Sequence, residues 1–431
     1  MQLLLFQFIA YNLRKISRIQ VFEYQKLKFD SKENDFTERH FNAMVKFNEK
    51  NDNKYYTIIH KGIKFNSHVG VIQIGGLAIE ILPKADNSNS NSEEQKQKWQ
   101  NVLLNMLKIC KKINVDNISE TALKKRYNAI LEVYFEMYLN EVEKLIQKGL
   151  IKKYRRVQKN QLALKGKLVF TKNIQKNNAH KERFYCEHQV YDKNHLLHEI
   201  IYRGLKILDG FIFGHLKDKL NRVLFHFSDF KEVTINEAHF SKIIANRKSQ
   251  PYNKAIDIAK MIILNYAPNL NSGNDNMLAL LFDMNKLWEE YIYRILQKYK
   301  PVDYNISPQN STKFWETKRI KPDIVIKHKE ETLIIDTKWK IISSYKPSDD
   351  DLKQMFAYNL FWKAEKSMLL YPKINQEDSL FGNYHHVPSD KESNQCKLGF
   401  INILSKNGIR KSNEIAEEIF SKFKVNPISS N

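Results

Sequence analysis

Two short apolar runs separated by a polar turn constrain the fold of this chain more than any other stretch. Ile324 to Ile326 and Thr332 to Ile335 flank the sequence HKEE, a pattern that predicts two buried strands joined as a β-hairpin. Asp323 precedes the first run and Asp336 follows the second, so the hairpin would bring two carboxylates together. Because burial and mutual repulsion both penalise such a pair, the pattern favours a bound divalent cation.

Lys338 adds an ammonium group to these two acids. Side chains two positions apart in a strand point to the same face, so Lys338 is expected to share a face with Asp336. Mg²⁺ typically takes one or two carboxylates and completes its shell with waters and substrate phosphate oxygens. Acids and amine in this arrangement can position a water and stabilise the charge that develops during phosphodiester hydrolysis.

The Asp-x-Lys triplet at Asp336 is informative only together with the sequence that flanks it. Similar triplets occur at Asp30 to Lys32, Glu316 to Lys318 and Asp351 to Lys353. The triplet at Asp336 differs because a Pro-Asp pair and an apolar strand precede it, and a helix with Gln354 and Tyr358 on one face follows. The start of that helix is marked by Pro347, Ser348 and three aspartates.

The order PD…DxK…QxxxY resembles the PD-(D/E)xK nuclease superfamily, in its branch with a Gln-x-x-x-Tyr helix. Four further segments narrow the resemblance: FDMNKLWEEYIYRIL, the strand pair KPDIVI and LIIDTKWK, the helix DLKQMFAY, and the N-terminal GLAIEILPK. Together they resemble the McrC family, the nuclease subunit of McrBC-type, methylcytosine-specific restriction systems. The resemblance covers most of the chain and is most specific from Asp283 to Tyr371.

The resemblance implies roles for individual residues. Asp323 and Asp336 would be metal ligands and Lys338 the catalytic lysine, while Glu289 would complete the metal site from a helix. Glu290 stays an alternative to Glu289, because at 100° per residue each lies roughly 60° outside the apolar stripe of that helix. Two further residues would support the site or contact DNA: Gln354 and Tyr358. The implied cofactor is Mg²⁺, with up to two ions per site and Mn²⁺ as a substitute.

The resemblance also implies partners: double-stranded, modified DNA and a hexameric McrB-like AAA+ GTPase. In that family the motor recognises the modified base, and the N-terminal region of the nuclease subunit engages the motor and stimulates GTP hydrolysis. This chain has no P-loop and no Gly-rich dinucleotide motif, which agrees with a separate motor. The alternatives are a motor-independent repair nuclease of the same superfamily and a catalytically inactive subunit that binds DNA or activates the motor.

Charge and cysteine content agree with a DNA-binding protein of the cytoplasm. The formal net charge of +22 favours a polyanionic partner, although a Lys-rich surface without such a partner would give the same excess. The three cysteines lie far apart without a Cys-x-x-Cys pair, so the sequence supports neither a disulfide framework nor a zinc knuckle. The apolar opening from Met1 to Tyr11 is shorter than the roughly 20 residues of a membrane span. We interpret it as a first strand or an upstream extension.

The 431 residues predict an α+β protein of several domains. Residues 1–85 are expected to form a small β-rich domain for motor interaction, because Ile19 to Lys84 has strand character and Gly75-Gly76 suits a two-residue hairpin turn. Residues 86–98 lack apolar side chains and predict a linker or exposed loop. A mainly helical middle region, 99–270, and an α/β PD-(D/E)xK restriction-endonuclease-like domain, 271–431, complete the chain.

Helical spacing of apolar residues predicts five helices before the hairpin. They are Trp99 to Lys112, Glu120 to Leu150, Leu196 to Leu208, Lys254 to Tyr266, and Met277 to about Tyr299, where Pro301 follows. Between the second and third helices, residues 151–170 carry a dense basic cluster that is either a DNA-contact surface or a solvated face. His195 and His198 are more readily explained as a surface or core pair than as metal ligands.

Overall fold

The computed structural model describes most of the chain and shows a mixed α+β protein with several sheets. The described residues are 16–31, 34–85, 92–113, 129–268, 276–342, 346–374, 376–385, 393–405 and 408–423. The predictions for Met1 to Tyr11, for residues 86–91 of the linker and for the first part of the helix at Glu120 lie outside them.

The chain divides into two compact units. Unit 1 comprises Met1–Ile16, Gln73–Gly76 and Asn128–Leu280, and unit 2 comprises Ser17–Ile72, Leu77–Tyr127 and Leu281–Asn431. The predicted segments 1–85 and 271–431 therefore fall largely within the same unit.

Unit 1 is built mainly of helices. Its longer helices are α5 (Ala129–Gln147), α7 (Leu196–Asp209), α8 (His215–Phe225) and α10 (Asn253–Leu264). Tyr138 of α5 is fully buried and donates its hydroxyl to the carbonyl of Ile201 at 2.7 Å. Gly204 is required at this crossing, because a Cβ there would lie 2.5 Å from the Tyr138 hydroxyl. The helices predicted at Leu196 and Lys254 are thus confirmed.

His195 and His198 form a core pair. Their rings lie 4.1 Å apart, and His198 is fully buried. The His198 ring contacts the Lys193 carbonyl at 2.6 Å through Nδ1 and the Tyr252 hydroxyl at 3.0 Å through Nε2. Of the two predicted settings, surface or core, these contacts show a core pair.

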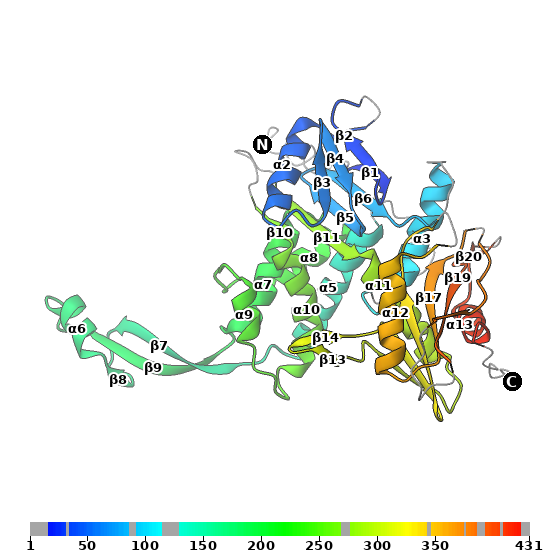
Figure 1. Ribbon diagram of the computed structural model, residues 1–431. Helices are drawn as coiled ribbons and strands as arrows, with labels where there is room; N and C mark the ends of the chain where they lie inside the picture. The colour runs from blue at the N-terminus through cyan, green and yellow to red at the C-terminus, as the bar shows by residue number, and fades with distance from the viewer. Residues whose placement is uncertain are drawn as a thin grey trace. The chain divides into compact units, whose positions relative to one another are not determined.

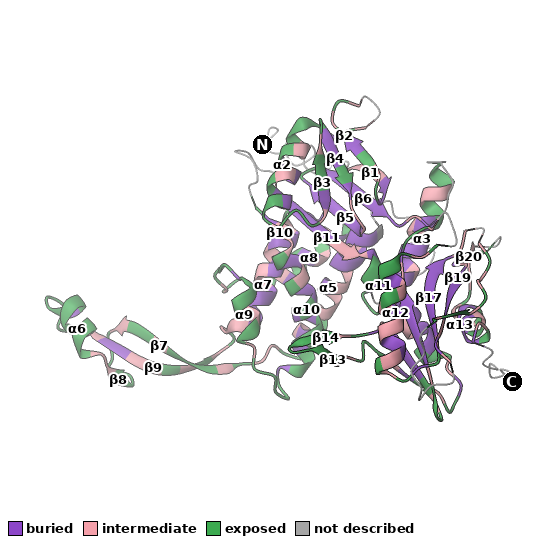
Figure 2. Cartoon of the chain, in the orientation of Figure 1, coloured by how far each residue is buried: buried purple, intermediate pink, exposed green. Residues whose placement is uncertain are grey.

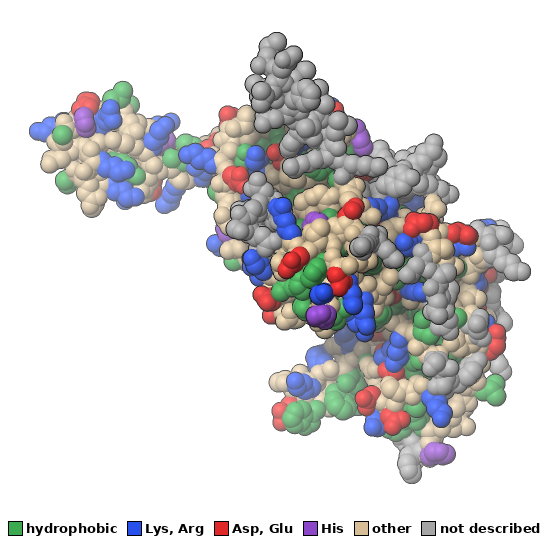
Figure 3. Space-filling model, turned by 90° about the horizontal axis from the view of Figure 1, so that it is seen from above, with side chains coloured by type: hydrophobic (Ala, Val, Ile, Leu, Met, Phe, Trp, Pro, Cys, Tyr) green, Lys and Arg blue, Asp and Glu red, His purple; other side chains and the backbone are tan. Residues whose placement is uncertain are grey.

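A long β arm projects from the helices of unit 1 (Figure 1). Strands β7 (Lys153–Gln161) and β9 (Phe184–Asp192) pair antiparallel along their whole length, and β8 (Lys167–Leu168) and helix α6 (Phe170–Asn177) lie at the far end. The arm carries the basic cluster predicted from the sequence, and Lys and Arg side chains are scattered over the face of the arm seen in Figure 3. The middle region is therefore not purely helical. Periodicity could not detect β7, because both of its faces are largely solvated and polar.

The N-terminal part of unit 2 contains the expected strands. It also contains one helix that was not predicted from the sequence. Three neighbouring strands of its main sheet lie in the order β1-β6-β5, from β1 (Ser17–Phe22), β6 (Leu77–Leu82) and β5 (His68–Ile74), and β1 runs parallel to β6. A smaller sheet follows the order β2-β4-β3, from β2 (Lys26–Lys28), β4 (Gly62–Phe65) and β3 (Tyr56–Ile59). Helix α2 (Glu38–Glu49) contacts β3 through the Tyr56 hydroxyl, which donates to the Met44 carbonyl at 2.7 Å.

The glycine turn predicted between β5 and β6 is present. Gly75 has φ 53°, the left-handed conformation that glycine adopts without strain. Every residue of β6 is buried, so the strand is covered on both faces rather than on one. Helix α3 (Glu93–Ile109) begins inside the predicted linker, where the Ser92 hydroxyl accepts from the Gln95 amide at 3.3 Å. The first turn of α3 carries only polar residues, which is why the apolar pattern predicted a later start.

The C-terminal part of unit 2 is a six-stranded mixed sheet of order β12-β15-β16-β17-β19-β18. The strands are β12 (Asn305–Pro308), β15 (Ile324–His328), β16 (Glu331–Thr337), β17 (Lys366–Pro372), β18 (Gly382–Asn383) and β19 (Gln395–Ile401). β15 and β16 form the predicted hairpin, while β17 runs parallel to both β16 and β19. Figure 2 shows the central strands buried beneath helices with exposed outer faces.

Two helices carry residues toward the ends of these strands. Helix α11 (Met284–Lys298) begins at Asp283, whose carboxylate accepts from the Asn285 amide at 3.0 Å. The helix predicted from Met277 is therefore wrong in its first turns, since Met277–Asp283 forms strand β11. A buried apolar strand and a buried helix turn cannot be separated by periodicity alone. Helix α12 (Asp349–Phe361) starts as predicted, with the Ser348 hydroxyl accepting from the Asp351 amide at 3.1 Å.

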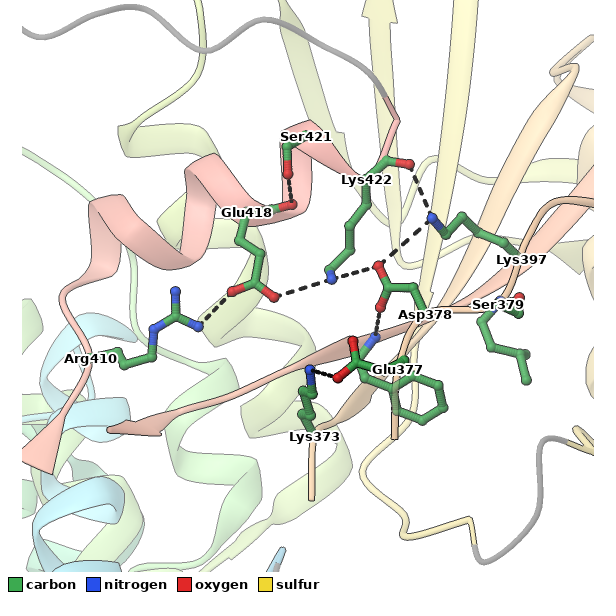
Figure 4. A network of polar contacts seen from close by, with 11 residues as sticks. Lys373, Glu377, Asp378, Ser379, Lys397, Arg410, Glu418, Ser421 and Lys422 are labelled. Carbon is green, nitrogen blue, oxygen red and sulfur yellow. Dashed lines mark hydrogen bonds and ion pairs between the residues drawn. The ribbon is translucent and has the colours of Figure 1, made fainter. Parts of the chain in front are cut away.

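A charged network fastens the last described helix, α13 (Ser412–Ser421), to the sheet (Figure 4). Asp378 pairs with Lys422 at 2.7 Å, and Lys422 also reaches Glu418 at 3.2 Å. Glu418 in turn forms an ion pair with Arg410 at 2.6 Å. Because each charge in this network has an opposite partner, the helix end can lie against the sheet without an unpaired ion.

The arm should be removable without loss of the unit 1 fold. Its three strands pair only with one another among the described residues, and Lys153 lies directly opposite Asp192. Deleting residues 154–191 and joining Lys153 to Asp192 through Asn-Gly should shift the thermal midpoint by less than about 4 °C, since Asn-Gly closes such a pair as a two-residue turn. Calorimetry of the two proteins measures this, and a fall several times larger would show that the arm stabilises the helices.

Glu23 should make unit 2 less stable as the pH rises. Its carboxylate is buried and accepts from Trp339 Nε1 at 2.6 Å and from the Lys84 amide at 2.9 Å. Burial, which outweighs these bonds, raises the pKa of Glu23 from 4.5 to about 7. The folded state therefore holds the proton more tightly, so its stabilising effect is complete below pH 4.5 and is lost as the pH rises to about 7.

Glu23→Gln should remove that pH dependence. Between pH 4.5 and pH 8 the wild type should lose about 3 kcal/mol more unfolding free energy than the variant. Urea denaturation at both pH values measures the difference, with exposed Glu49→Gln as the matched control. Equal losses in wild type and Glu23→Gln would contradict the prediction.

Candidate active site

The hairpin places the two predicted aspartates at neighbouring strand ends. Ile324 pairs with Ile335, so Asp323 and Asp336 lie one step beyond this pair. The Asp323 carboxylate accepts two hydrogen bonds from Thr337, one from the amide at 2.7 Å and one from the hydroxyl at 2.9 Å. These bonds fix one oxygen of Asp323 against β16.

Asp336 is the most buried acid of the site, with 2% of its surface exposed. Burial, followed by the charge of Asp323, raises the pKa of Asp336 well above its usual range. Burial also raises the pKa of Asp323, although the Thr337 bonds and Lys338 oppose this effect. The pair thus disfavours its own double negative charge, and a cation between the two carboxylates would relieve that cost.

Lys338 lies between two acids. Its Nζ is 2.7 Å from Asp336 and 3.2 Å from Asp351, and it donates to the side-chain oxygen of Gln354 at 3.3 Å. Burial alone would lower the pKa of Lys338, but the ion pairs with Asp336 and Asp351 raise it to about 12. The lysine is therefore a fixed positive charge beside the carboxylates.

Gln354 and Tyr358 support this lysine from α12. The Gln354 amide donates to the Tyr358 hydroxyl at 2.6 Å, and that hydroxyl donates to the Lys321 carbonyl at 2.8 Å. A continuous chain of contacts therefore runs from Lys338 through α12 to the backbone just before Asp323. Both residues therefore contact the site, and the supporting or DNA-contacting roles predicted for them stay predictions.

Glu289 and Glu290 have different surroundings. Glu289 accepts from the Gln309 amide at 2.6 Å, and burial, followed by the charge of Asp323, raises its pKa. Glu290 instead pairs with Arg294 at 2.8 Å and with Lys112 at 2.9 Å. Of the two glutamates, Glu289 is thus the one whose pKa is raised by the charge of Asp323.

The donor set suits a metal held by two carboxylates. Within the part of the chain that the structure describes, no three His, Cys, Asp or Glu side chains converge closely enough to hold a metal ion. Glu289 therefore lies at the edge of the site rather than in a cluster of three ligands. Asp323 and Asp336 match the one or two carboxylates that Mg²⁺ uses when waters and phosphate oxygens complete its shell.

Asp351 and Gln309 are part of the site although the sequence analysis assigned them no role. Asp351 opens one of the competing Asp-x-Lys triplets, yet it pairs with both Lys338 and Lys340, the latter at 2.6 Å. Burial raises the pKa of Asp351, but hydrogen bonds from Lys340 and Ser348 outweigh this effect and hold it below the usual value. The three aspartates at the start of α12 were the available signal, and they indicated only a helix start.

Gln309 links three parts of the site. Its backbone amide donates to the Asp323 carbonyl at 2.9 Å, its side-chain amide donates to Glu289, and its side-chain oxygen accepts from Lys321 at 3.0 Å. With φ 46° it adopts the left-handed conformation, which is uncommon outside glycine. No sequence pattern marked this position.

Comparisons with known proteins identify a matching family and several similar chains of solved structures. A family model described as McrBC 5-methylcytosine restriction system component matches residues 63–372, a span that contains every predicted site residue. One similar chain belongs to the refined half-complex from the tetradecameric assembly of Thermococcus gammatolerans McrB AAA+ hexamers with bound McrC. It is 17% identical with a TM-score of 0.64, and the match covers 94% of this chain and 100% of that chain.

A chain of the Thermococcus gammatolerans McrBC complex solved by cryo-EM is 18% identical with a TM-score of 0.47, over 66% of this chain and 88% of that chain. The comparison with curated proteins gave no match. Among the described residues, no helix has the length and apolar character needed to cross a bilayer.

For a nuclease with this site, Asp351→Asn should slow DNA cleavage by about 10- to 100-fold, the usual effect of losing a partner that orients a site residue. The amide would free Lys338 from one of its two ion pairs and let its Nζ shift. Cleavage rates measured with Mg²⁺, GTP and the partner GTPase, with exposed Asp350→Asn from the same helix turn as control, test this. A wild-type rate for Asp351→Asn would exclude a positioning role.

Proposed function

Because this chain belongs to the family of McrBC 5-methylcytosine restriction system components, we propose that it is the subunit that cleaves DNA. The observation that carries the proposal is the convergence of Asp323, Asp336 and Lys338 at the ends of two paired strands. We further propose that the six-stranded sheet with α11 and α12 is a PD-(D/E)xK nuclease core.

The side chains have separate tasks in this proposal. Asp323 and Asp336 would hold Mg²⁺, which lowers the pKa of a bound water and polarises a phosphate. Lys338, kept protonated by two acids, would stabilise the negative charge that develops on the phosphate oxygens. Thr337 orients Asp323, while Gln354 and Asp351 hold Lys338 in position.

The proposed partner is a hexameric AAA+ GTPase of the McrB type. The similar Thermococcus gammatolerans structure is described as McrB AAA+ hexamers with bound McrC, and the shared fold extends over 94% of this chain. We propose that the β-rich N-terminal segment contacts the motor and stimulates its GTP hydrolysis, while the motor selects modified DNA. The absence of a P-loop from the sequence supports this division of labour.

The basic arm is a second proposed DNA contact. Arg156 of β7 is largely exposed, with 75% of its side chain accessible, and its nearest acid, Glu187, lies 3.8 Å away. Loss of the arm should then weaken DNA binding and reduce its salt dependence, because fewer counterions would be released. If the arm-deleted protein bound DNA with unchanged affinity, the basic cluster would be a solvated face and not a DNA contact.

Asp336→Asn should reduce DNA cleavage by at least about 100-fold, since the site would lose a carboxylate ligand and its ion pair with Lys338. Partner binding and GTPase stimulation should persist. Cleavage of methylated duplex DNA with Mg²⁺, GTP and the partner GTPase measures the first effect, and GTP turnover measures the second. Asp349→Asn, an exposed acid at the start of α12, is the matched control.

The outcomes separate the alternatives. Cleavage that survives Asp336→Asn would contradict the assigned site. Strong cleavage by the purified chain without any GTPase would instead favour a motor-independent repair nuclease. Wild-type protein that stimulates the GTPase but never cleaves would indicate a catalytically inactive, motor-activating subunit.

A further inference from the structure

A hollow lies beside the carboxylates within unit 2. Its volume is about 540 Å³, and its walls come from β5, the start of α11 and the end of β12. Glu289 and Gln309 line it, and Gln309 also donates its backbone amide to the Asp323 carbonyl. The hollow therefore shares a wall with the proposed active site.

His68 is a buried polar side chain of this hollow without a hydrogen-bond partner. Only 6% of its surface is exposed, and neither Nδ1 nor Nε2 meets a partner among the described residues. Its ring contacts Tyr55 edge to face, with 5.2 Å between ring centroids. Because an unpaired buried polar group costs free energy, an imidazole kept here indicates a ligand that supplies the missing partner.

The charges around the hollow favour an anion. Lys54 and Lys286 line it, and neither has an ion-pair partner within 4.0 Å in the described part of the chain. Three acids also line the hollow: Glu290 pairs with Lys112 and Arg294, Asp283 caps α11, and Glu289 accepts from the Gln309 amide. The lining thus has four cationic side chains against three acids, with Lys54 and Lys286 outside any ion pair among the described residues.

The N-terminus of helix α11 adds to the positive electrostatic potential in the hollow. The Met284 amide donates to the Ser67 carbonyl at 2.8 Å, which brings the first turn of α11 beside His68. A helix N-terminus carries partial positive charge. Burial lowers the pKa of His68; Lys54 and Lys286 also lower it, while Asp283 raises it. The imidazole is therefore neutral at neutral pH and offers one N–H donor.

We propose that this hollow binds a phosphate of the DNA strand next to the phosphodiester that is cut, with His68, Lys54 and Lys286 as its donors. The proposal rests on the nuclease function proposed above. A phosphodiester of the substrate strand fits better than a free nucleotide, because the wall formed by Glu289 leads directly to Asp323. Tyr55 and Tyr293 provide aromatic surface for a sugar or base beside that phosphate. The β-rich N-terminal segment would then take part in substrate binding.

Three variants of the full-length chain test the proposal: His68→Phe, Lys54→Gln and Lys286→Gln. Their dissociation constants for a fluorescent DNA duplex are measured in EDTA, where the duplex stays intact, over a range of salt concentrations. Each lysine variant should weaken binding about three- to tenfold and reduce the salt slope by about 1. His68→Phe should weaken binding about tenfold through the lost donor, yet keep or raise the thermal midpoint because an unpaired polar group is removed.

Lys64→Gln is the matched control, because Lys64 is the exposed residue of the otherwise buried strand β4 and does not line the hollow. Wild-type affinity and salt slope in the two lysine variants would overturn the proposal, even if His68→Phe failed to fold. An equal loss in Lys64→Gln would overturn it as well, since the effect would be one of general charge.

Two further results keep this proposal separate from the nuclease function. Titration with thymidine 5′-monophosphate distinguishes the sources of phosphate: lost nucleotide binding with wild-type duplex affinity would overturn the assignment to DNA. If Asp336→Asn still cleaves, the nuclease site is wrong, while the duplex measurements still decide whether the hollow binds phosphate.

Discussion

The repulsion between two buried carboxylates is the constraint on which the C-terminal half of unit 2 depends. Asp323 and Asp336 are held together by strand pairing, although burial opposes the charge of both. Thr337 and Lys338 offset part of this cost, and Asp351 and Lys340 extend the network. With all groups ionised, three carboxylates face two ammonium groups, which leaves one negative charge for a cation to balance.

The same network explains why α12 must lie where it does. Lys338 can serve as a fixed charge only if its two other contacts keep its Nζ from pairing with Asp336 alone. Gln354 and Asp351 of α12 supply those two contacts, and Tyr358 connects Gln354 to the backbone just before Asp323. A helix that begins with aspartates therefore contributes to the electrostatics of the site as well as to the packing of the sheet.

The sequence predicted those parts of the fold whose cause is local. The hairpin follows from alternate apolar runs and a polar turn, and α12 follows from a capping serine and four-residue spacing. The predictions failed where contacts between residues distant in the sequence decide the structure, or where a helix and a strand share one sequence pattern. Strand β11 carries the same apolar run as a helix, strand β7 of the arm has no apolar face, and α2 was hidden among strand-like segments. Asp351 and Gln309 belong to the site only through pairs that bridge many residues of chain, such as Lys338 with Asp351 and Gln309 with Glu289.

The division into units changes how the N-terminal strands are understood. Ser17–Ile72 and Leu281–Asn431 belong to one compact unit, within which Glu23 accepts from Trp339, the residue directly after Lys338. Helix α11 makes a second connection, because Lys286 lines the hollow and Glu289, three residues later, lies beside Asp323. Residues three apart on a helix are neighbours at about 5–6 Å between their Cβ atoms. The distance from the hollow to the carboxylates of the proposed active site is therefore set by a rigid helix rather than by a loop. A DNA strand bound in the hollow would then reach these carboxylates in a fixed register.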